Sequence, residues 1–229
     1  GAAATVYSAR DHATGERVAL KLIRGVGAGD LARFRREVQT LAQIQHPSVV
    51  RYVDHGHTED GLAYLVMEWL EGEDLKSRLA RGPLEIHEAI VLGRNVASAL
   101  SVLHGHKLVH RDVKPGNIFL PGGSIAEAKL VDFGLVRADE LSQESVITAM
   151  GAVLGTPHYM SPEQARGQVG LDARADIFSL GCVLYQCIAG RAPFEGNHIV
   201  TVLTKVLLQN AAPLRELRPD VPRALADLV

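Results

Sequence analysis

The sequence predicts an α+β fold in which a small antiparallel sheet and one helix precede a larger, mainly helical part. Strand-like alternation is concentrated before Glu68, and helical periodicity dominates after it. A polar stretch from His110 to Gly134, broken by short apolar runs, lies near the middle of the chain. With 229 residues the chain is long enough for one large domain or two lobes.

The first part contains four strand signals. Residues 5–10 alternate like a strand, Thr14 and Gly15 mark a hairpin turn, and residues 18–23 form the partner strand. Residues 49–53 and 62–68 give two more strand signals, separated by a turn that contains Gly56 and Gly61.

A helix is predicted over residues 30–44, because Phe34, Val38 and Leu41 recur at helical spacing. Glu37 lies on the same apolar stripe, so its carboxylate faces protein. Lys21 is a cation in an otherwise apolar strand, where burial without a partner is unfavourable. We therefore expect a Lys21–Glu37 ion pair, with a snorkelling lysine and a rim glutamate as the alternative.

The later part reads as helical. Residues 85–104 carry an apolar stripe that includes Ile90 and end before Gly105. Residues 172–188 form a nearly buried helix that closes at Gly190. Residues 197–209 form an amphipathic helix, for which Asn197 is the expected cap.

The polar stretch contains four side chains suited to catalysis or metal binding. Short strands are expected at 108–109, 118–120 and 130–131, which puts the polar residues at strand ends and in turns. These are Asp112, Lys114, Asn117 and Asp132. An Asp and an Asn suit Mg²⁺ shared with phosphates, and a second carboxylate can accept a proton. Together these four residues favour transfer of a phosphoryl group from a metal-bound nucleotide over a solvated loop in which Asp and Asn only cap the turns.

The run from His110 to Asn117, HRDVKPGN, followed by Asp132-Phe133-Gly134, resembles the catalytic loop and metal motif of eukaryotic-type protein kinases. Residues 155–163, GTPHYMSPE, resemble the end of that family's activation segment, with Ser161 where Ala is usual. The resemblance implies a bilobal fold with an N-lobe over 1–68, a hinge over 69–73 and a C-lobe over 74–229. Relative to the family, the chain would lack the start of the glycine-rich loop and the C-terminal helices.

The resemblance also implies catalytic roles. Asp112 would be the base, Lys114 would steady the moving phosphoryl group, and Asn117 with Asp132 would hold the metal. Lys21, paired with Glu37, would position the α- and β-phosphates. The implied cofactors are ATP and Mg²⁺, with Mn²⁺ as a possible substitute.

A nucleotide pocket is implied in the same way. Gly1 matches the second glycine of the glycine-rich loop and Ala4 replaces the third, which we expect to weaken phosphate positioning. Met67 would gate the back of the pocket, Glu68 would begin the hinge that binds adenine, and Asp74 would meet the ribose. The further residues assigned to the nucleotide by the resemblance are Val6, Ala19, Leu70, Asn117, Phe119 and Asp132.

Two features concern regulation of the catalytic loop. Asp176 could lie near its helix N-terminus for electrostatic reasons, or bond the backbone of the catalytic loop as the family's matching acid does. Arg111 precedes Asp112, which in the family often accompanies activation by a phosphate in the loop that follows. Thr148, Ser145 or Ser142 would be the acceptor, and an unmodified loop is the alternative.

Lys114 and Thr156 fit the serine/threonine pattern, with Thr156 expected to bond Asp112 and Lys114. Gly116 replaces an acid that reads basic residues in some substrates. The run over 155–167 is most like bacterial members. A pseudokinase scaffold is the alternative function, suggested by Ala4. A small-molecule kinase is disfavoured by the segment at 155–163, which in the family docks a polypeptide.

Composition sets the remaining expectations. A formal net charge of −2 gives no reason to expect nucleic acid as a partner, so ATP and protein substrates are the expected partners. Cys182 and Cys187 would face different sides of one helix, which suits a reducing, cytoplasmic location. No apolar run suggests a membrane segment, although a longer parent protein could be anchored. The histidines lack a zinc-ligand spacing, and the oligomeric state stays open.

Overall fold

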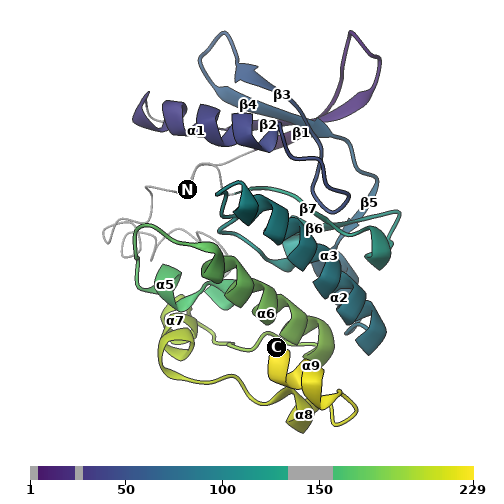
Figure 1. The fold of residues 1–229 in the computed structure, drawn as a ribbon, viewed down its shortest axis with the longest axis vertical. Helices are drawn as coiled ribbons and strands as arrows, with labels where there is room; N and C mark the ends of the chain where they lie inside the picture. Colours follow the sequence, from purple (N-terminus) through teal and green to yellow (C-terminus); the bar gives the residue numbers. More distant parts are fainter. Residues whose placement is uncertain (1–4, 24–27, 134–156) are drawn as a thin grey trace.

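The computed structural model describes residues 5–23, 28–133 and 157–229, with side chains described from residue 34 onward in the first helix. Gly1, Ala4, Thr156 and the three candidate phosphorylation sites therefore lie outside the described residues. Figure 1 shows a smaller lobe with a sheet and one helix above a larger, mainly helical lobe. The chain therefore has the α+β, bilobal architecture expected from its sequence.

The smaller lobe is built on a four-stranded antiparallel sheet in the order β1-β2-β4-β3. Its strands are β1 (Thr5–Arg10), β2 (Arg17–Ile23), β3 (Tyr52–His57) and β4 (Ala63–Glu68). The expected hairpin is confirmed, with Gly15 at a φ of 75° in the turn that joins β1 to β2. The register sets Lys21 beside Val6 on one side and Leu65 on the other.

Helix α1 (Ala28–Leu41) packs on this sheet (Figure 1). The predicted apolar stripe is confirmed, since Phe34, Val38 and Leu41 are buried in the main core. The prediction of a strand over 49–53 is wrong in its position. Residues 48–50 instead dock on the larger lobe, where Val50 N–H donates to Leu130 O at 3.0 Å and Leu130 N–H donates to Ser48 O at 2.8 Å. Val49 and Val50 are apolar because this contact buries them.

A second sheet joins the lobes, with three short strands in the order β5-β6-β7. They are β5 (Gly72–Asp74), β6 (Ile118–Pro121) and β7 (Lys129–Leu130), and helix α2 (Leu75–Leu79) follows β5. The strand expected at 108–109 does not form, and these two residues lead into the polar stretch as irregular backbone. Asp74 caps α2, because its Oδ1 accepts the Ser77 N–H at 2.7 Å.

The larger lobe is organised around helices α3 (Ile86–Gly105) and α6 (Ala173–Ala189), which pack side by side (Figure 1). Both helices carry buried apolar stripes. Ile90 of α3, which the sequence places on the stripe, is instead 42% exposed and lies outside the core. Within the described part of the chain, α3 alone has the length and hydropathy of a membrane span, and its apolar stripe lies in the domain core.

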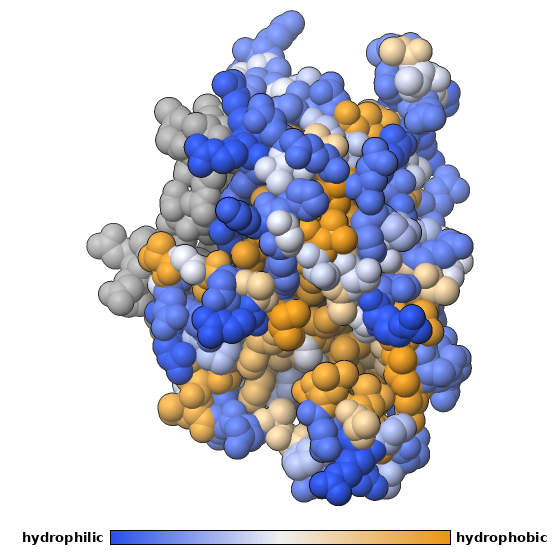
Figure 2. All heavy atoms as spheres, viewed as in Figure 1, coloured by the Kyte–Doolittle hydropathy of each residue, from blue (hydrophilic) through white to orange (hydrophobic). Residues whose placement is uncertain are grey.

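The remaining helices complete the lower part of the molecule. They are α5 (Pro162–Ala165), α7 (Ile199–Leu208), α8 (Leu214–Leu217) and α9 (Arg223–Leu228). His198, not Asn197, is the N-cap of α7, and its side chain makes no capping hydrogen bond. Figure 2 shows a face that is mostly hydrophilic over the smaller lobe and more hydrophobic over α6 and α9.

The two cysteines face different sides of α6, as expected. Cys187 belongs to the main core, whereas Cys182 packs with Phe194, Val202 and Val206 in a second cluster. Both thiols are free, and burial raises the pKa of each to about 12. They are therefore packing residues in their protonated form, which removes them as nucleophiles.

Candidate active site

Three side chains of the polar stretch meet at the segment that leads into β6. Asp112 Oδ2 accepts hydrogen bonds from Lys114 Nζ at 2.9 Å and from Asn117 Nδ2 at 2.9 Å. Asn117 Nδ2 also donates to the Asp112 backbone oxygen at 2.8 Å. The side chains of Asp112 and Lys114 are 16% and 21% exposed, so both can still reach a ligand from solvent. The sequence prediction that these residues converge is confirmed by this geometry.

The local backbone explains why they converge. Lys114 is extended, and Pro115 then begins a single 3₁₀ turn that ends at Asn117, where β6 starts. Proline suits the first position of such a turn because its φ is fixed and it has no N–H to leave unbonded. Asn117 is 5% exposed, and its backbone oxygen accepts the Val131 N–H at 3.0 Å. This last bond ties the catalytic loop to the segment that carries Asp132.

Asp132 and Lys21 form an ion pair across the two lobes. Lys21 Nζ of β2 lies 3.0 Å from Asp132 Oδ1, with the two side chains 15% and 38% exposed. Asp132 has a φ of 58°, a left-handed conformation that few non-glycine residues adopt, and it directly precedes buried Phe133. The described partner of Lys21 is therefore Asp132, which sequence reasoning did not predict. The Lys21–Glu37 pair stays a prediction.

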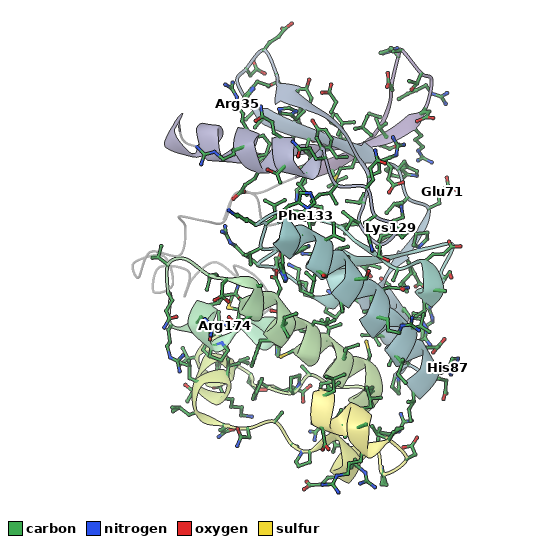
Figure 3. The ribbon with its side chains drawn as sticks, in the orientation of Figure 1. Arg35, Glu71, His87, Lys129, Phe133 and Arg174 are labelled. Carbon is green, nitrogen blue, oxygen red and sulfur yellow. The ribbon has the colours of Figure 1, made fainter. Side chains whose placement is uncertain are left out.

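Glu37 lies close to this centre. It lines a small hollow together with residues of α1, α3 and the catalytic stretch, namely Leu41, Leu103, Leu108, Val109, His110 and Phe133. Figure 3 labels Phe133, which lies between α1 and α3. The His110 and Phe133 rings pack with their centroids 5.2 Å apart. This contact joins the start of the polar stretch, at His110, directly to its end, at Phe133.

The catalytic loop is fixed from below by Asp176 of α6. Asp176 is fully buried, and its oxygens accept the backbone N–H groups of His110 and Arg111, each at 2.8 Å. Of the two readings of Asp176, bonding to the catalytic loop is thus confirmed. Arg111 has a φ of 64°, and such left-handed residues persist where surrounding contacts hold them.

His104 of α3 supplies a third bond to Asp176, with its Nε2 at 2.8 Å from Oδ2. Sequence reasoning considered His104 only as a metal ligand and missed this contact. The available signal was its position in the last turn of α3, four residues after the buried Leu100 and on the same face of the helix.

His110 is held in a neutral form by its two ring contacts. Nδ1 accepts the Asp112 N–H at 3.3 Å, which leaves Nε2 to donate to Val131 O at 3.2 Å. Burial lowers the pKa of His110 below its ordinary value, although nearby Asp176 opposes the shift. Protonation would place an N–H at Nδ1 against the Asp112 N–H and remove that bond.

Acid should therefore destabilise the protein through His110. A histidine whose pKa is lower in the folded state binds its proton preferentially when unfolded, so stability is lost as pH falls below about 6.5. The loss is at most about 1.4 kcal/mol per pH unit for one group. Thermal unfolding of wild type and His110→Phe at pH 6.5 and 5.5 checks this. The pH-dependent fall in Tm should be smaller in the variant, while His12→Phe in an exposed turn should behave as wild type. An equal fall in His110→Phe would contradict the assignment.

Glu68, the last residue of β4, connects the two sheets on the hinge side of the site. Its carboxylate accepts from Lys129 Nζ of β7 at 2.6 Å and from the Arg51 N–H at 2.8 Å. Figure 3 labels Lys129 near the junction of the two sheets and Glu71 beyond it at the edge. Met67 is buried beside Ala19 in the neighbouring strand, which places both at the end of the first sheet. Contacts of the hinge with adenine stay a prediction.

The other residues assigned to the nucleotide lie along the two sheets. Val6 of β1 is 50% exposed, and Leu70 is partly buried between β4 and β5. Phe119 of β6 pairs in register with Asp74 and Lys129. Asp74 is committed through one oxygen to the cap of α2, so a ribose contact would use its other oxygen. These roles stay predictions, as does that of Gly1, which is not described.

The donor set fits a hard divalent cation. The described hydrogen bonds of the Asn117 amide all run through its nitrogen, which leaves Oδ1 as an acceptor. Asp132 presents a partly exposed carboxylate next to Val131, whose N–H is bonded to the Asn117 backbone oxygen. Within the described residues no group of three or more His, Cys, Asp and Glu side chains is placed to hold a metal. Two protein oxygens leave most coordination positions to phosphates and water, which is usual for Mg²⁺.

Comparison with models of known protein families shows to which family the chain belongs. A family model described as a protein kinase domain matches residues 1–227. The chain belongs to the protein kinase domain family. The family's presence over nearly the whole chain agrees with the bilobal fold and with the catalytic-loop geometry above.

Relatives are bacterial serine/threonine-protein kinases. The chain is 37% identical over 233 residues to PrkC of Bacillus subtilis, with 100% of this chain and 35% of that protein covered. It is 38% identical over 220 residues to PknB of Mycobacterium leprae, with 93% of this chain and 35% of that protein covered. The chain thus spans about a third of the length of these curated relatives.

The fold has a close counterpart among solved structures. A crystal structure of Rad53 residues 1–466 in complex with AMP-PNP matches with a TM-score of 0.77 and 26% identity. The match covers 99% of this chain and 56% of that one. The arrangement of the two lobes is therefore that of a known protein kinase.

Proposed function

We propose that this chain is the catalytic domain of a serine/threonine protein kinase, which transfers the γ-phosphoryl group of Mg-ATP to Ser or Thr hydroxyls of proteins. The observation that carries the proposal is the junction at Asp112, where a carboxylate is bonded by Lys114 and Asn117 on one short loop. The relatives support it, since their names state serine/threonine-protein kinase activity for those proteins.

Each side chain has a defined task in the proposal. Asp112 orients the acceptor hydroxyl and takes its proton, because its carboxylate is positioned by two donors and remains partly exposed. Lys114 balances negative charge next to Asp112 as the phosphoryl group moves. Lys21, now paired with Asp132, lies where it can exchange that partner for nucleotide phosphates. Asn117 and Asp132 would hold Mg²⁺, which supplies charge neutralisation of the phosphates when bound.

A pseudokinase scaffold is the alternative function. Ala4 in the glycine-rich loop motivated it, and Ala4 lies outside the described residues. All the side chains that the transfer step needs are present, and the Asp112 carboxylate accepts hydrogen bonds from both Lys114 and Asn117. We therefore favour an active kinase. Autophosphorylation at Thr148, Ser145 or Ser142 remains part of the proposal.

The proposed setting follows from the chemistry. ATP is an intracellular reactant, and both cysteines are free thiols, so we place the domain in the cytoplasm. Proteins are the proposed acceptors, and Mg²⁺ is the proposed metal, with Mn²⁺ as a substitute. A bacterial origin is proposed from the relatives.

The metal role is tested by Asp132→Asn. The substitution keeps the shape of the side chain but removes the negative charge that would bind the cation and that pairs with Lys21. We expect phosphoryl transfer at 1 mM Mg²⁺ to fall at least about 100-fold and the Mg²⁺ concentration for half-maximal activity to rise. Initial rates measured over a Mg²⁺ series check both quantities. Asp172→Asn, an exposed acid at the start of α6, is the control. An unchanged Mg²⁺ dependence in Asp132→Asn would remove Asp132 from the metal site.

A further inference from the structure

Gln164 is a buried amide side chain that connects two parts of the larger lobe. It lies in α5 and is 7% exposed. Its Oε1 accepts the Ser161 N–H at 3.0 Å, which completes a capping box at the start of α5. Its Nε2 donates to the backbone oxygen of Arg111 at 2.8 Å. One side chain thus spans from the 157–165 segment to the catalytic loop.

The bond to Arg111 falls at the strained point of that loop. Arg111 has a φ of 64°, and its N–H is held by Asp176 Oδ1 at 2.8 Å. Gln164 holds the carbonyl group of the same residue. Both backbone polar groups of Arg111 are therefore bound by buried side chains from two different helices, α6 and α5. Figure 1 shows these helices next to each other in the larger lobe.

The same bond also fixes the peptide plane that leads into Asp112. That plane carries the Arg111 oxygen on one edge and the Asp112 N–H on the other. Gln164 binds the oxygen at 2.8 Å, and His110 Nδ1 accepts the N–H at 3.3 Å. Rotation of the plane would break both contacts, so the direction in which Asp112 leaves the loop depends on Gln164.

We propose that Gln164 is a positioning residue that couples the 157–165 segment to Asp112. The inference rests on the proposed role of Asp112 as the base. Since α5 and the 3₁₀ turn over Pro157–Tyr159 belong to the segment assigned to polypeptide docking, movement there is transmitted to the Arg111–Asp112 peptide through a single amide. Gln164 touches no reacting atom. Its contribution is to hold the base in a productive direction.

A purely structural role in capping α5 is the competing explanation, and the chain offers variants that separate the two. Gln164→Glu keeps the size and the acceptor for Ser161 but replaces the donor to Arg111 with an oxygen. Gln164→Met keeps the length and removes both bonds. Ser161→Ala removes the hydroxyl that accepts the Gln164 N–H at 3.3 Å and leaves the Gln164–Arg111 bond in place.

The experiment measures kcat and the KM for ATP in the full chain, with dephosphorylated casein as the acceptor, together with Tm for each variant. For Gln164→Glu and Gln164→Met we expect kcat to fall about 10- to 100-fold while the KM for ATP stays within about twofold of wild type. Ser161→Ala should keep kcat within about twofold. The Tm of each variant shows whether it is folded at the assay temperature, because Gln164→Glu sets a carboxylate oxygen against the buried Arg111 oxygen and should itself lower Tm.

Asp112→Ala, run in parallel, separates failure of this inference from failure of the proposed function. Wild-type kcat in Gln164→Glu beside an inactive Asp112→Ala overturns the coupling and leaves the proposed function standing. Equal losses of kcat in Ser161→Ala and the Gln164 variants would show a capping role only. Full activity in Asp112→Ala would overturn the proposed base itself. If Gln164→Met fails to fold, the isosteric Gln164→Glu decides.

Discussion

Replacing Asp112 with alanine is expected to lower kcat for phosphoryl transfer by about 10²- to 10⁴-fold, equivalent to about 3–5 kcal/mol of activation free energy. The variant removes the carboxylate that Lys114 and Asn117 both contact, so it deletes the proposed base and the centre of its cluster. ATP binding should persist, because the proposed phosphate and metal contacts come from Lys21, Asn117 and Asp132. Initial rates and calorimetric titration with ATP check the two halves of this expectation.

Asp112→Asn and Asp60→Ala serve as controls for that variant. Asp112→Asn keeps the shape of the side chain but is a far weaker proton acceptor, so it should be nearly as inactive as Asp112→Ala. Asp60 is an exposed acid in the turn before β4 and its loss should leave kcat within about twofold. Activity in Asp112→Asn close to wild type would mean that proton acceptance is not the role of this residue.

The second large effect is expected at Asp176, this time on stability as well as activity. Asp176→Ala removes a buried acceptor from three donors: the N–H groups of His110 and Arg111, and His104 Nε2. Removing one partner of such a buried set typically costs about 3–5 kcal/mol. Because about 1 kcal/mol corresponds to roughly 2–4 °C for a chain of this size, Tm should fall by roughly 6–20 °C.

Below its own Tm, the Asp176→Ala variant should also have a reduced kcat, since the left-handed backbone at Arg111 loses the bond that holds its N–H. Thermal unfolding and initial rates at 15 °C measure the two effects separately. Asp172→Ala on the same helix is the matched control. Its exposed carboxylate caps α6 through the Arg174 N–H, and its loss should cost only about 1 kcal/mol. Similar Tm values for the two variants would contradict the proposed role of Asp176.

Local pattern was enough to predict much of the fold. The strand over Thr5–Arg10 was predicted to the residue, because alternation, a Thr-Gly turn and an apolar partner strand agree with one another. The stripe of Phe34, Val38 and Leu41 likewise predicted which face of α1 is buried. Motif spacing predicted the convergence of Asp112, Lys114 and Asn117, since these residues lie within one short loop.

Contacts between distant segments could not be predicted in this way. Val49 and Val50 are as apolar as strand residues, yet they are buried by docking on β7 instead of by pairing in the first sheet. Lys21 needs an acidic partner, and local sequence does not indicate that Asp132 lies 3.0 Å from its ammonium group. His104 lies in the last turn of α3 and Gln164 in the short helix α5, and the role of each depends on a partner far away in the sequence, Asp176 for His104 and the Arg111 oxygen for Gln164.

The measurement that tests the central claim most directly is intact-mass analysis of the protein after incubation with Mg-ATP, beside Asp112→Ala and followed by mapping of the modified residues. The account predicts added phosphate on Ser or Thr in the wild type and none in Asp112→Ala. Phosphate on both proteins, or on neither under conditions in which wild type binds Mg-ATP, would contradict a kinase that uses Asp112 as its base.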